Sequence, residues 1–210
     1  ITVIKTKNIR FLLSEVASKF YKLKPKRIFA VTGTNGKTSV SELFYQILTL
    51  NKISVASIGT FGVKYKDKII KTGLTSPDTI SIHKYLQLLK KNKIENVIIE
   101  ASSHGLDQNR LDHLNLKAGI FTNFSQDHLD YHKTMKKYLN AKLLLFKNIL
   151  PSRSSIITDE EIKQFAIIKK ISKKRKLRLV KIKKIFKKIE NIFEDKYNMF
   201  QKKNLSMAIA

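Results

Sequence analysis

The sequence contains no cysteine and no tryptophan, and it has only seven glycines and three prolines in 210 residues. Without cysteine the chain can form neither a disulfide nor a thiolate metal site, and we expect the reducing cytoplasm as its compartment. We find no apolar run long enough to cross a bilayer and no signal-peptide pattern, so we expect no membrane insertion. The 42% of hydrophobic residues is instead typical of a globular chain that buries one good core.

Acidic residues are also scarce: 16 Asp and Glu stand against 42 Lys and Arg, which gives a formal net charge of +26. Such a balance is typical of proteins that neutralise nucleic-acid phosphates, and a basic nucleic-acid-binding NTPase is one hypothesis. However, only six of the basic residues are arginine, and the lysines are spread along the whole chain. Specific readers of nucleic acid use arginine forks and stacked aromatic rings. We therefore favour solvated lysine faces and expect no specific nucleic-acid partner.

Two of the rare glycines fall within one short stretch, Val-Thr-Gly-Thr-Asn-Gly-Lys-Thr-Ser at residues 31–39. An apolar run precedes it and an amphipathic segment follows it, which predicts a strand, a glycine-rich turn and a helix. Gly33 and Gly36 allow successive amides to point at one anion, and the helix N-terminus adds partial positive charge. Lys37 can reach the terminal phosphates of a nucleotide, and the Thr38 hydroxyl can hold Mg²⁺.

The match to the general phosphate-binding loop is incomplete. That pattern has a glycine five residues before Gly36, where this chain has Val31. The sequence fits the shorter pattern Gly-Thr-Asn-Gly-Lys-Thr, and a glycine-rich turn without a ligand is the structural alternative. We favour the phosphate loop because Gly-Lys-Thr falls at the predicted junction of strand and helix.

Predicted strands and helices alternate along the chain, which predicts an α/β fold: a P-loop-type, mostly parallel sheet with helices on both faces. Strands are expected at 27–31, 54–58, 96–100, 118–121 and 155–158, a hairpin at 63–65 and 69–71, and helices at 9–21, 40–48, 80–91, 135–150 and 160–169. The alternation in 176–183 and 187–193 predicts exposed antiparallel strands, a small antiparallel region near the C-terminal part. In the helix at 9–21 we expect a shared buried side formed by Phe11, Leu12, Val16 and Phe20.

Four side chains are expected to meet at the edge of the sheet where the loop lies. Glu100 ends a predicted strand, His128 follows the next one, Lys142 lies on the succeeding helix and Thr38 is in the loop. Thr and Glu oxygens suit Mg²⁺, whereas histidine is a less usual ligand and an unmodified ammonium would repel the ion. Taken singly, Glu100 could cap a helix, His128 could be a turn residue and Lys142 could be a surface lysine.

Several segments, in the same order, resemble the central ATPase domain of the Mur ligases. They are residues 33–38, 74–78, 100–106, 108–110, 121–123 with 127–132, and 138 with 141–142. The segment Ser-Ser-His-Gly-Leu at 102–106 makes the branch of the UDP-N-acetylmuramoyl-tripeptide synthetases the most similar one. A related ATP-dependent ligase acting on a folate or a poly-amino acid is the alternative within the same class of enzymes.

The resemblance implies roles for individual residues. ATP would be bound by Gly33, Thr34, Asn35, Gly36, Lys37, Thr38 and Ser39, and the UDP-muramoyl dipeptide by Thr75, Ser76, Ser102, Gln108 and Arg110. In the family the lysine matching Lys142 is carboxylated, so that a cation becomes a carbamate anion, an N6-carboxylysine. Mg²⁺ would then be held by Thr38, Glu100, His128 and Lys142, and the catalytic residues would be Lys37, His128 and Lys142.

The implied reaction is ATP-dependent amide formation in peptidoglycan biosynthesis, and hence in cell-wall formation, cell shape and division. The carboxylate of UDP-N-acetylmuramoyl-L-alanyl-D-glutamate would attack the γ-phosphate, and meso-diaminopimelate or L-lysine would capture the acyl phosphate. Family members have three domains. We expect residues 1–23 to be the tail of the first, residues 24–210 to be the central one with its end truncated, and the C-terminal domain to be absent. The piece alone should bind nucleotide, turn over poorly and be monomeric.

Overall fold

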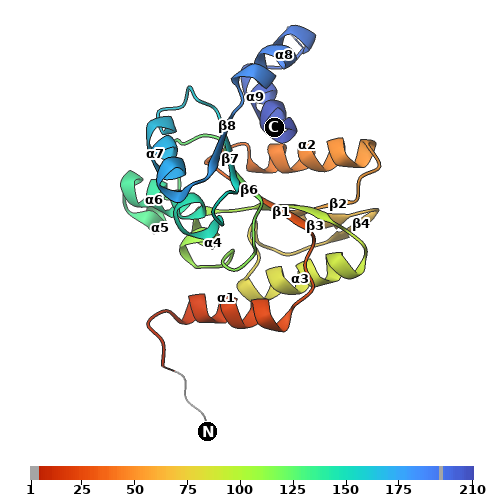
Figure 1. The fold of residues 1–210 in the computed structure, drawn as a ribbon, viewed down its shortest axis with the longest axis vertical. Helices are drawn as coiled ribbons and strands as arrows, with labels where there is room; N and C mark the ends of the chain where they lie inside the picture. Colours follow the sequence, from red (N-terminus) through yellow and green to blue (C-terminus); the bar gives the residue numbers. More distant parts are fainter. Residues whose placement is uncertain (1–4, 194–195) are drawn as a thin grey trace.

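A computed structural model describes residues 5–193 and 196–210, so the first four residues of the predicted tail at 1–23 lie outside the described residues. The described residues form an eight-stranded sheet of order β4-β3-β2-β5-β1-β6-β7-β8 (Figure 1). The strands are β1 (Arg27–Thr32), β2 (Val55–Gly59), β3 (Gly62–Tyr65), β4 (Lys68–Ile70), β5 (Asn96–Glu100), β6 (Ala118–Phe121), β7 (Ser155–Thr158) and β8 (Arg178–Lys181). All neighbouring strands are parallel except β2–β3 and β3–β4.

Helices cover both faces of this sheet, as Figure 1 shows. They are α1 (Ile9–Phe20), α2 (Lys37–Leu50), α3 (Thr79–Lys91), α4 (Ser103–Asp107), α5 (Leu129–His132), α6 (Met135–Leu144) continued by the π-helical η1 (Leu145–Ile149), α7 (Phe165–Arg175), α8 (Lys183–Phe193) and α9 (Met199–Ile209). Side chains alternate between the two faces of a strand, so β1 contributes to two cores. Ile28 packs in a core with α3, α6 and α7, and Val31 packs in a second core with α2 and α9. The predicted α/β class is confirmed.

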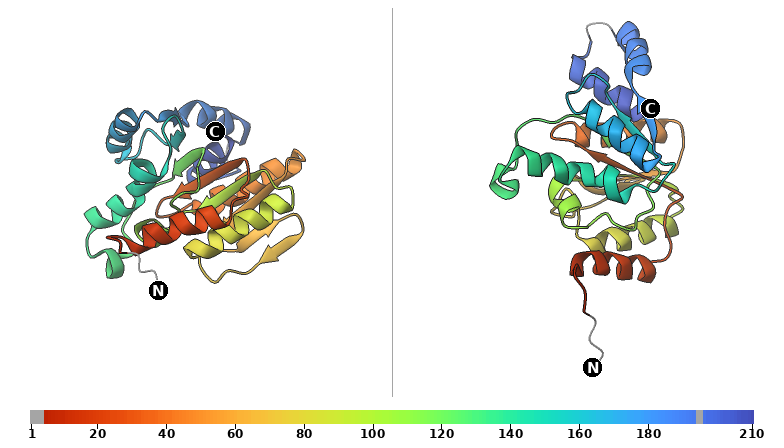
Figure 2. Two further views of the ribbon diagram at one scale, coloured as in Figure 1. Left: turned by 60° about the horizontal axis from the view of Figure 1, so that its bottom comes forward. Right: turned by 60° about the vertical axis from the view of Figure 1, so that its left-hand side comes forward.

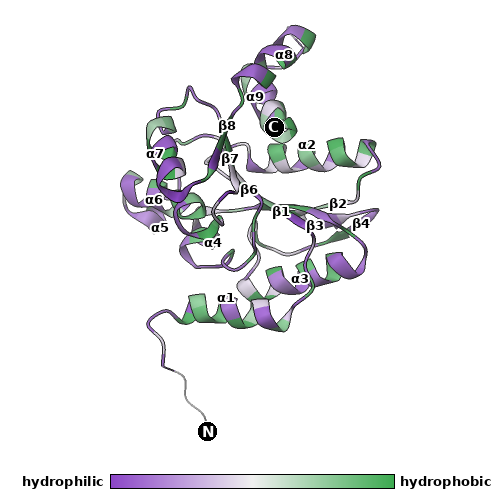
Figure 3. Cartoon of the chain, in the orientation of Figure 1, coloured by the Kyte–Doolittle hydropathy of each residue, from purple (hydrophilic) through white to green (hydrophobic). Residues whose placement is uncertain are grey.

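The antiparallel part of the sheet lies elsewhere than predicted. It is the β2–β3–β4 edge, which contains the predicted hairpin, whereas β8 pairs in parallel with β7. Residues 187–193, expected as the second exposed strand, belong to the helix α8. The lysine pairs at 183–184 and 187–188 recur every four residues, which is helical spacing. Ile189, which follows the second pair, is the buried residue of this helix, and α8 packs against α9. Figure 3 shows hydrophilic and hydrophobic residues side by side along α8.

The buried side of α1 also differs from the prediction. Phe11, Val16 and Phe20 are 42%, 54% and 75% exposed, Leu12 is half-buried, and the buried residues are Ser14 and Ala17. The helix packs closely along α3 (Figure 2), and small side chains permit that approach. The Ser14 hydroxyl donates to the Asp112 carbonyl over 2.8 Å. Hydrogen bonding to the 112–113 segment therefore determines which side of α1 faces inward.

Two other helices begin or end differently from the expectation. The predicted helix at 160–169 is displaced and forms as α7, with Gln164 at its N-cap, and the helix expected at 135–150 is divided between α6 and η1. Among the helices of the described residues, none combines the length and the apolar character that a bilayer crossing needs.

Candidate active site

The glycine-rich loop connects β1 directly to α2. Gly36 is the N-cap of α2 with φ 83°, a conformation that favours glycine. A β-carbon on Gly33, whose φ is 152°, would collide with Thr122 Oγ1. The loop is anchored to the segment after β6, because the Thr34 and Asn35 amides donate to the main-chain and side-chain oxygens of Asn123 over 3.0 and 2.9 Å. The backbone is thus fixed by its neighbours, with the α2 N-terminus beside it.

Two lysines bind the carbonyls of this loop. Lys37 Nζ donates to the carbonyls of Gly33 and Thr34 over 3.0 and 2.8 Å, and Lys142 Nζ donates to that of Gly33 over 2.7 Å. Lys142 is 1% exposed and its ammonium lies 4.4 Å from the centre of the Tyr138 ring. Burial, reinforced by the positive charge of Lys37, lowers the pKa of Lys142 to about 7, and burial also lowers the pKa of Lys37. Lys142 can therefore lose its proton near neutral pH.

Glu100 lies beneath the start of α2, where β5 ends. Its Oε2 accepts hydrogen bonds from the hydroxyls of Thr38 and Thr60 over 2.8 and 3.2 Å, and its Oε1 accepts the Thr60 amide over 3.0 Å. A β-carbon on Gly59 would collide with Glu100 Oε1, so a glycine is needed for this approach. The carboxylate and the Thr38 hydroxyl, both predicted metal ligands, are therefore in contact.

A pocket of about 280 Å³ adjoins the loop and gathers most of the other predicted site residues. Its lining includes Lys37, Thr75, Ser76, Ser102, Arg110, His128 and Lys142. Arg110 Nη1 donates to the Ser76 carbonyl over 2.6 Å, and the Ser76 hydroxyl donates to the Glu100 carbonyl over 2.8 Å. Cationic and hydroxyl side chains from several elements thus converge beside the glycine-rich loop.

Of the remaining predicted residues, Ser39 and Gln108 lie outside this pocket, whereas His128 lines it from a tight turn. Ser39 is exposed and lines a different cavity, between α2 and α9. The Gln108 side chain contacts Arg110, with its Oε1 2.6 Å from Arg110 Nη2. His128 is the N-cap of α5 in the left-handed conformation, and its ring lies 5.0 Å from that of His104. No group of three His, Cys, Asp or Glu side chains arranged for a metal ion is found in residues 5–193 and 196–210.

The sequence interpretation missed the residues that support the loop. Asn123 and Tyr138 occur in the segments that resemble the Mur ligases, but they were not assigned to the site. Tyr138 donates to the Thr34 hydroxyl over 3.3 Å. Asn204 of α9 lies against Gly36, with its Oδ1 2.7 Å from where a β-carbon would be. A pairing between the first loop and the last helix leaves no local signal in the sequence.

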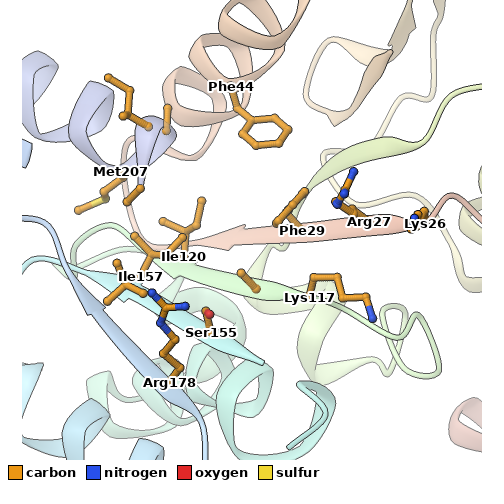
Figure 4. A pocket seen from close by; sticks show the side chains of 15 residues that line it. Lys26, Arg27, Phe29, Phe44, Lys117, Ile120, Ser155, Ile157, Arg178 and Met207 are labelled. Carbon is orange, nitrogen blue, oxygen red and sulfur yellow. The ribbon is translucent and has the colours of Figure 1, made fainter. Parts of the chain in front are cut away.

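A larger cavity, of about 580 Å³, lies between the sheet and helices α2 and α9, toward the N-terminal ends of β1, β6, β7 and β8 (Figure 4). Phe29, Ile120 and Ile157 form its apolar surface, and it contains none of the predicted site residues. Cavity size alone therefore does not identify the candidate site.

The fold and the site together define an α/β domain with a mostly parallel sheet, whose glycine-rich loop is contacted by a buried lysine. A family model described as the Mur ligase middle domain matches residues 31–207. The chain therefore belongs to the Mur ligase family, which confirms the resemblance stated above.

Two relatives are named UDP-N-acetylmuramoyl-L-alanyl-D-glutamate–2,6-diaminopimelate ligase. The one from Zymomonas mobilis is 44% identical over 176 residues, which cover 83% of this chain and 36% of the relative. The one from Rickettsia bellii is 43% identical over 182 residues, which cover 84% of this chain and 38% of the relative. The chain thus spans little more than a third of the length of these relatives.

A solved structure of a ligase with the same name has a TM-score of 0.70 at 28% identity, covering 81% of this chain and 34% of that chain. Escherichia coli FolC in complex with DHPP and ADP has a TM-score of 0.63 at 18% identity, covering 85% of this chain and 47% of that chain. At this identity the likeness shows a shared fold alone.

Proposed function

We propose that this chain is the ATP-binding part of a ligase that joins 2,6-diaminopimelate to UDP-N-acetylmuramoyl-L-alanyl-D-glutamate in peptidoglycan biosynthesis. In this proposal residues 24–210 belong to the central domain and the preceding residues to the tail of a first domain. The names of the relatives support the substrates. The observation that carries the proposal is the buried Lys142, which donates to the Gly33 carbonyl and lines a pocket together with Lys37 and Arg110.

The chain's own groups fit the binding of two anionic substrates. The loop amides and Lys37 bind the phosphates, and Lys37 has two carbonyl partners that it can exchange for phosphate oxygens. The Arg110 guanidinium can pair with two oxygens of the second substrate at once. Holding both anions at fixed positions offsets their repulsion, which is the main obstacle to phosphoryl transfer to a carboxylate.

The reaction then has two steps. A carboxylate oxygen of the muramoyl dipeptide attacks the γ-phosphorus, the bond to ADP breaks, and an acyl phosphate forms. The diaminopimelate amine next attacks the acyl carbon, phosphate leaves, and the nitrogen loses a proton to give the amide. Lys37 and Arg110 hold the reacting groups in line, which accounts for much of the rate gain in such transfers.

The residues present fit Mg²⁺ only if Lys142 is modified. Thr38 and Glu100 offer hard oxygen atoms, and their contact of 2.8 Å places both beside the loop, with His128 in the adjoining pocket. A bound Mg²⁺ would neutralise charge on the phosphates. The Lys142 ammonium would oppose such an ion. If the neutral amine attacks CO₂, an N–C bond forms, a proton leaves, and the side chain becomes a carbamate anion; its lowered pKa favours this reaction.

The test uses the full-length protein that contains these residues. It should convert ATP, UDP-N-acetylmuramoyl-L-alanyl-D-glutamate and diaminopimelate to ADP, phosphate and the tripeptide product, identified by mass spectrometry. Parallel reactions with L-lysine as the amine, and with a folate and glutamate, separate the other ligase hypotheses. Residues 1–210 alone should bind ATP with little turnover. Product from the folate reaction but not from the muramoyl dipeptide would refute the proposal.

A further inference from the structure

The Arg110 guanidinium is held by three hydrogen bonds to neutral oxygens. Nη1 donates to the Ser76 carbonyl over 2.6 Å, while Nε and Nη2 donate to Gln108 Oε1 over 3.1 and 2.6 Å. These acceptors orient the planar guanidinium without neutralising its charge, so the charge stays available for an anionic ligand. Gln108 provides two of the three bonds. The orientation of Arg110 therefore depends on the orientation of the Gln108 amide.

A tyrosine on the neighbouring α5 fixes that amide. Gln108 Nε2 donates to the Tyr131 hydroxyl over 3.4 Å, and this hydroxyl donates to Asp107 Oδ2 over 2.9 Å. A carboxylate only accepts hydrogen bonds, so Asp107 requires the tyrosine to be the donor. The Tyr131 oxygen can then only accept a hydrogen bond from Gln108. It therefore faces the Gln108 NH₂ group, and Gln108 Oε1 points toward Arg110. The chain of hydrogen bonds therefore has a single direction, from Arg110 to Asp107.

The ring of Tyr131 is held independently of this chain. It lies 4.2 Å from the His104 ring and 4.7 Å from the His132 ring, measured between ring centroids. Its outer end, together with Asp107, opens into a hollow of about 500 Å³ between α4, α5 and α6. Removing the hydroxyl should therefore leave the ring in place, because the neighbouring rings still hold it and water can reach the vacated position.

We propose that Tyr131 and Asp107 are positioning residues that set the Arg110 guanidinium for a carboxylate-bearing substrate by way of Gln108. This deepens the proposed function and rests on it for the identity of the ligand. Neither residue lines the pocket that contains Arg110 and Lys142, so neither is assigned to substrate contact. Loss of a neutral hydrogen bond of this kind corresponds to roughly a three- to tenfold change in an equilibrium constant.

The experiment compares Tyr131→Phe and Asp107→Ala in the full-length enzyme. For each variant we expect the KM for the UDP-muramoyl dipeptide to rise about three- to tenfold, with the KM for ATP and kcat within about twofold of wild type. The double variant should be no worse than the poorer single variant, because both act through one chain of bonds. Tyr21→Phe, at the C-cap of the distant α1, is the matched control and should change nothing.

A second measurement needs no turnover and separates this inference from the proposed function. Hydrogen exchange at Arg110 Nε, followed by NMR in residues 1–210 without ligand, should be about three- to tenfold faster in Tyr131→Phe than in wild type. Absence of ligase activity in the wild type would contradict the proposed function and leave this measurement valid. Unchanged exchange in Tyr131→Phe, or an equal rise of both KM values, would overturn the positioning role.

Discussion

Replacing Lys142 with methionine should stabilise the fold while abolishing ligation. Lys142 is 1% exposed, and its pKa is lowered from 10.5 to about 7, chiefly by burial. A shift of this size means that keeping the lysine charged inside the protein costs up to about 5 kcal/mol. Methionine retains an unbranched apolar stem without the charge, at the loss of about 1 kcal/mol for the hydrogen bond to Gly33. At pH 6 we therefore expect Lys142→Met to raise the free energy of unfolding by about 2–4 kcal/mol.

The pH dependence gives this prediction its sign. The pKa of Lys142 is lower in the folded state than in the unfolded state, so the unfolded chain binds the proton more tightly. The wild type should gain about 1.4 kcal/mol of stability per pH unit from this group as the pH rises from about 7 toward 10.5. The advantage of Lys142→Met should shrink at the same rate. Urea denaturation at pH 6, 7, 8 and 9 in CO₂-free buffer, followed by circular dichroism, measures it.

Lys136→Met is the matched control, because Lys136 is an exposed lysine on the same helix. It should leave the free energy of unfolding unchanged at every pH. A difference between Lys142→Met and wild type that is the same at pH 6 and pH 9 would refute the reasoning from burial. Added bicarbonate at pH 8 should stabilise the wild type, because its folded state takes up CO₂ at the Lys142 amine. It should not stabilise Lys142→Met, which has no amine at this position.

Three further predictions concern other parts of the chain. Gly33→Ala should lower the free energy of unfolding by more than about 2 kcal/mol and abolish ATP binding in calorimetry, because its β-carbon would collide with Thr122. His83 is buried, and burial lowers its pKa from 6.5 to about 4, so stability should fall by up to about 3 kcal/mol between pH 6.5 and 4; His83→Leu should remove that slope. Binding to duplex DNA should be weak, without sequence preference, and lost by about 0.2 M salt. A tight, sequence-selective complex would restore the hypothesis of a nucleic-acid-binding NTPase.

The parts of the site that the sequence predicted are those set by local geometry and by parallel strands. The loop was predictable because its glycines and Lys37 fall where a strand meets a helix. Glu100 was predictable because it ends a buried strand, and in the structure it is paired in register with Val31 of β1, immediately before the loop. The carboxyl ends of adjacent parallel strands lie at the same edge of the sheet. The sequence therefore predicted that each motif following a strand lies at that edge.

The parts that were not predicted depend on pairings distant in sequence. The burial of Ser14 in α1 follows from its contact with Asp112, and nothing within α1 itself favours a serine over Phe11 or Val16. The contact of Asn204 with Gly36 joins the last helix to the first loop. For α8, the sequence carried both patterns: its alternation suggested a strand, and its four-residue spacing of lysine pairs, which agrees with the observed helix, was the better guide.

The two lysines at the loop are coupled, and this gives Lys37 a second role. Both ammonium groups donate to the Gly33 carbonyl, and the charge of Lys37 contributes to the lowered pKa of Lys142. The same positive charge that disfavours an ammonium at Lys142 favours a carbamate there, since the interaction changes from repulsion to attraction. Lys37→Met should therefore raise the pKa of Lys142 and reduce its carboxylation, besides weakening ATP binding at least about tenfold. Mass spectrometry or ¹³C NMR with labelled bicarbonate can follow the carbamate in the absence of ATP. Full carboxylation in Lys37→Met would show that burial alone prepares Lys142, and that the loop lysine acts only on the nucleotide.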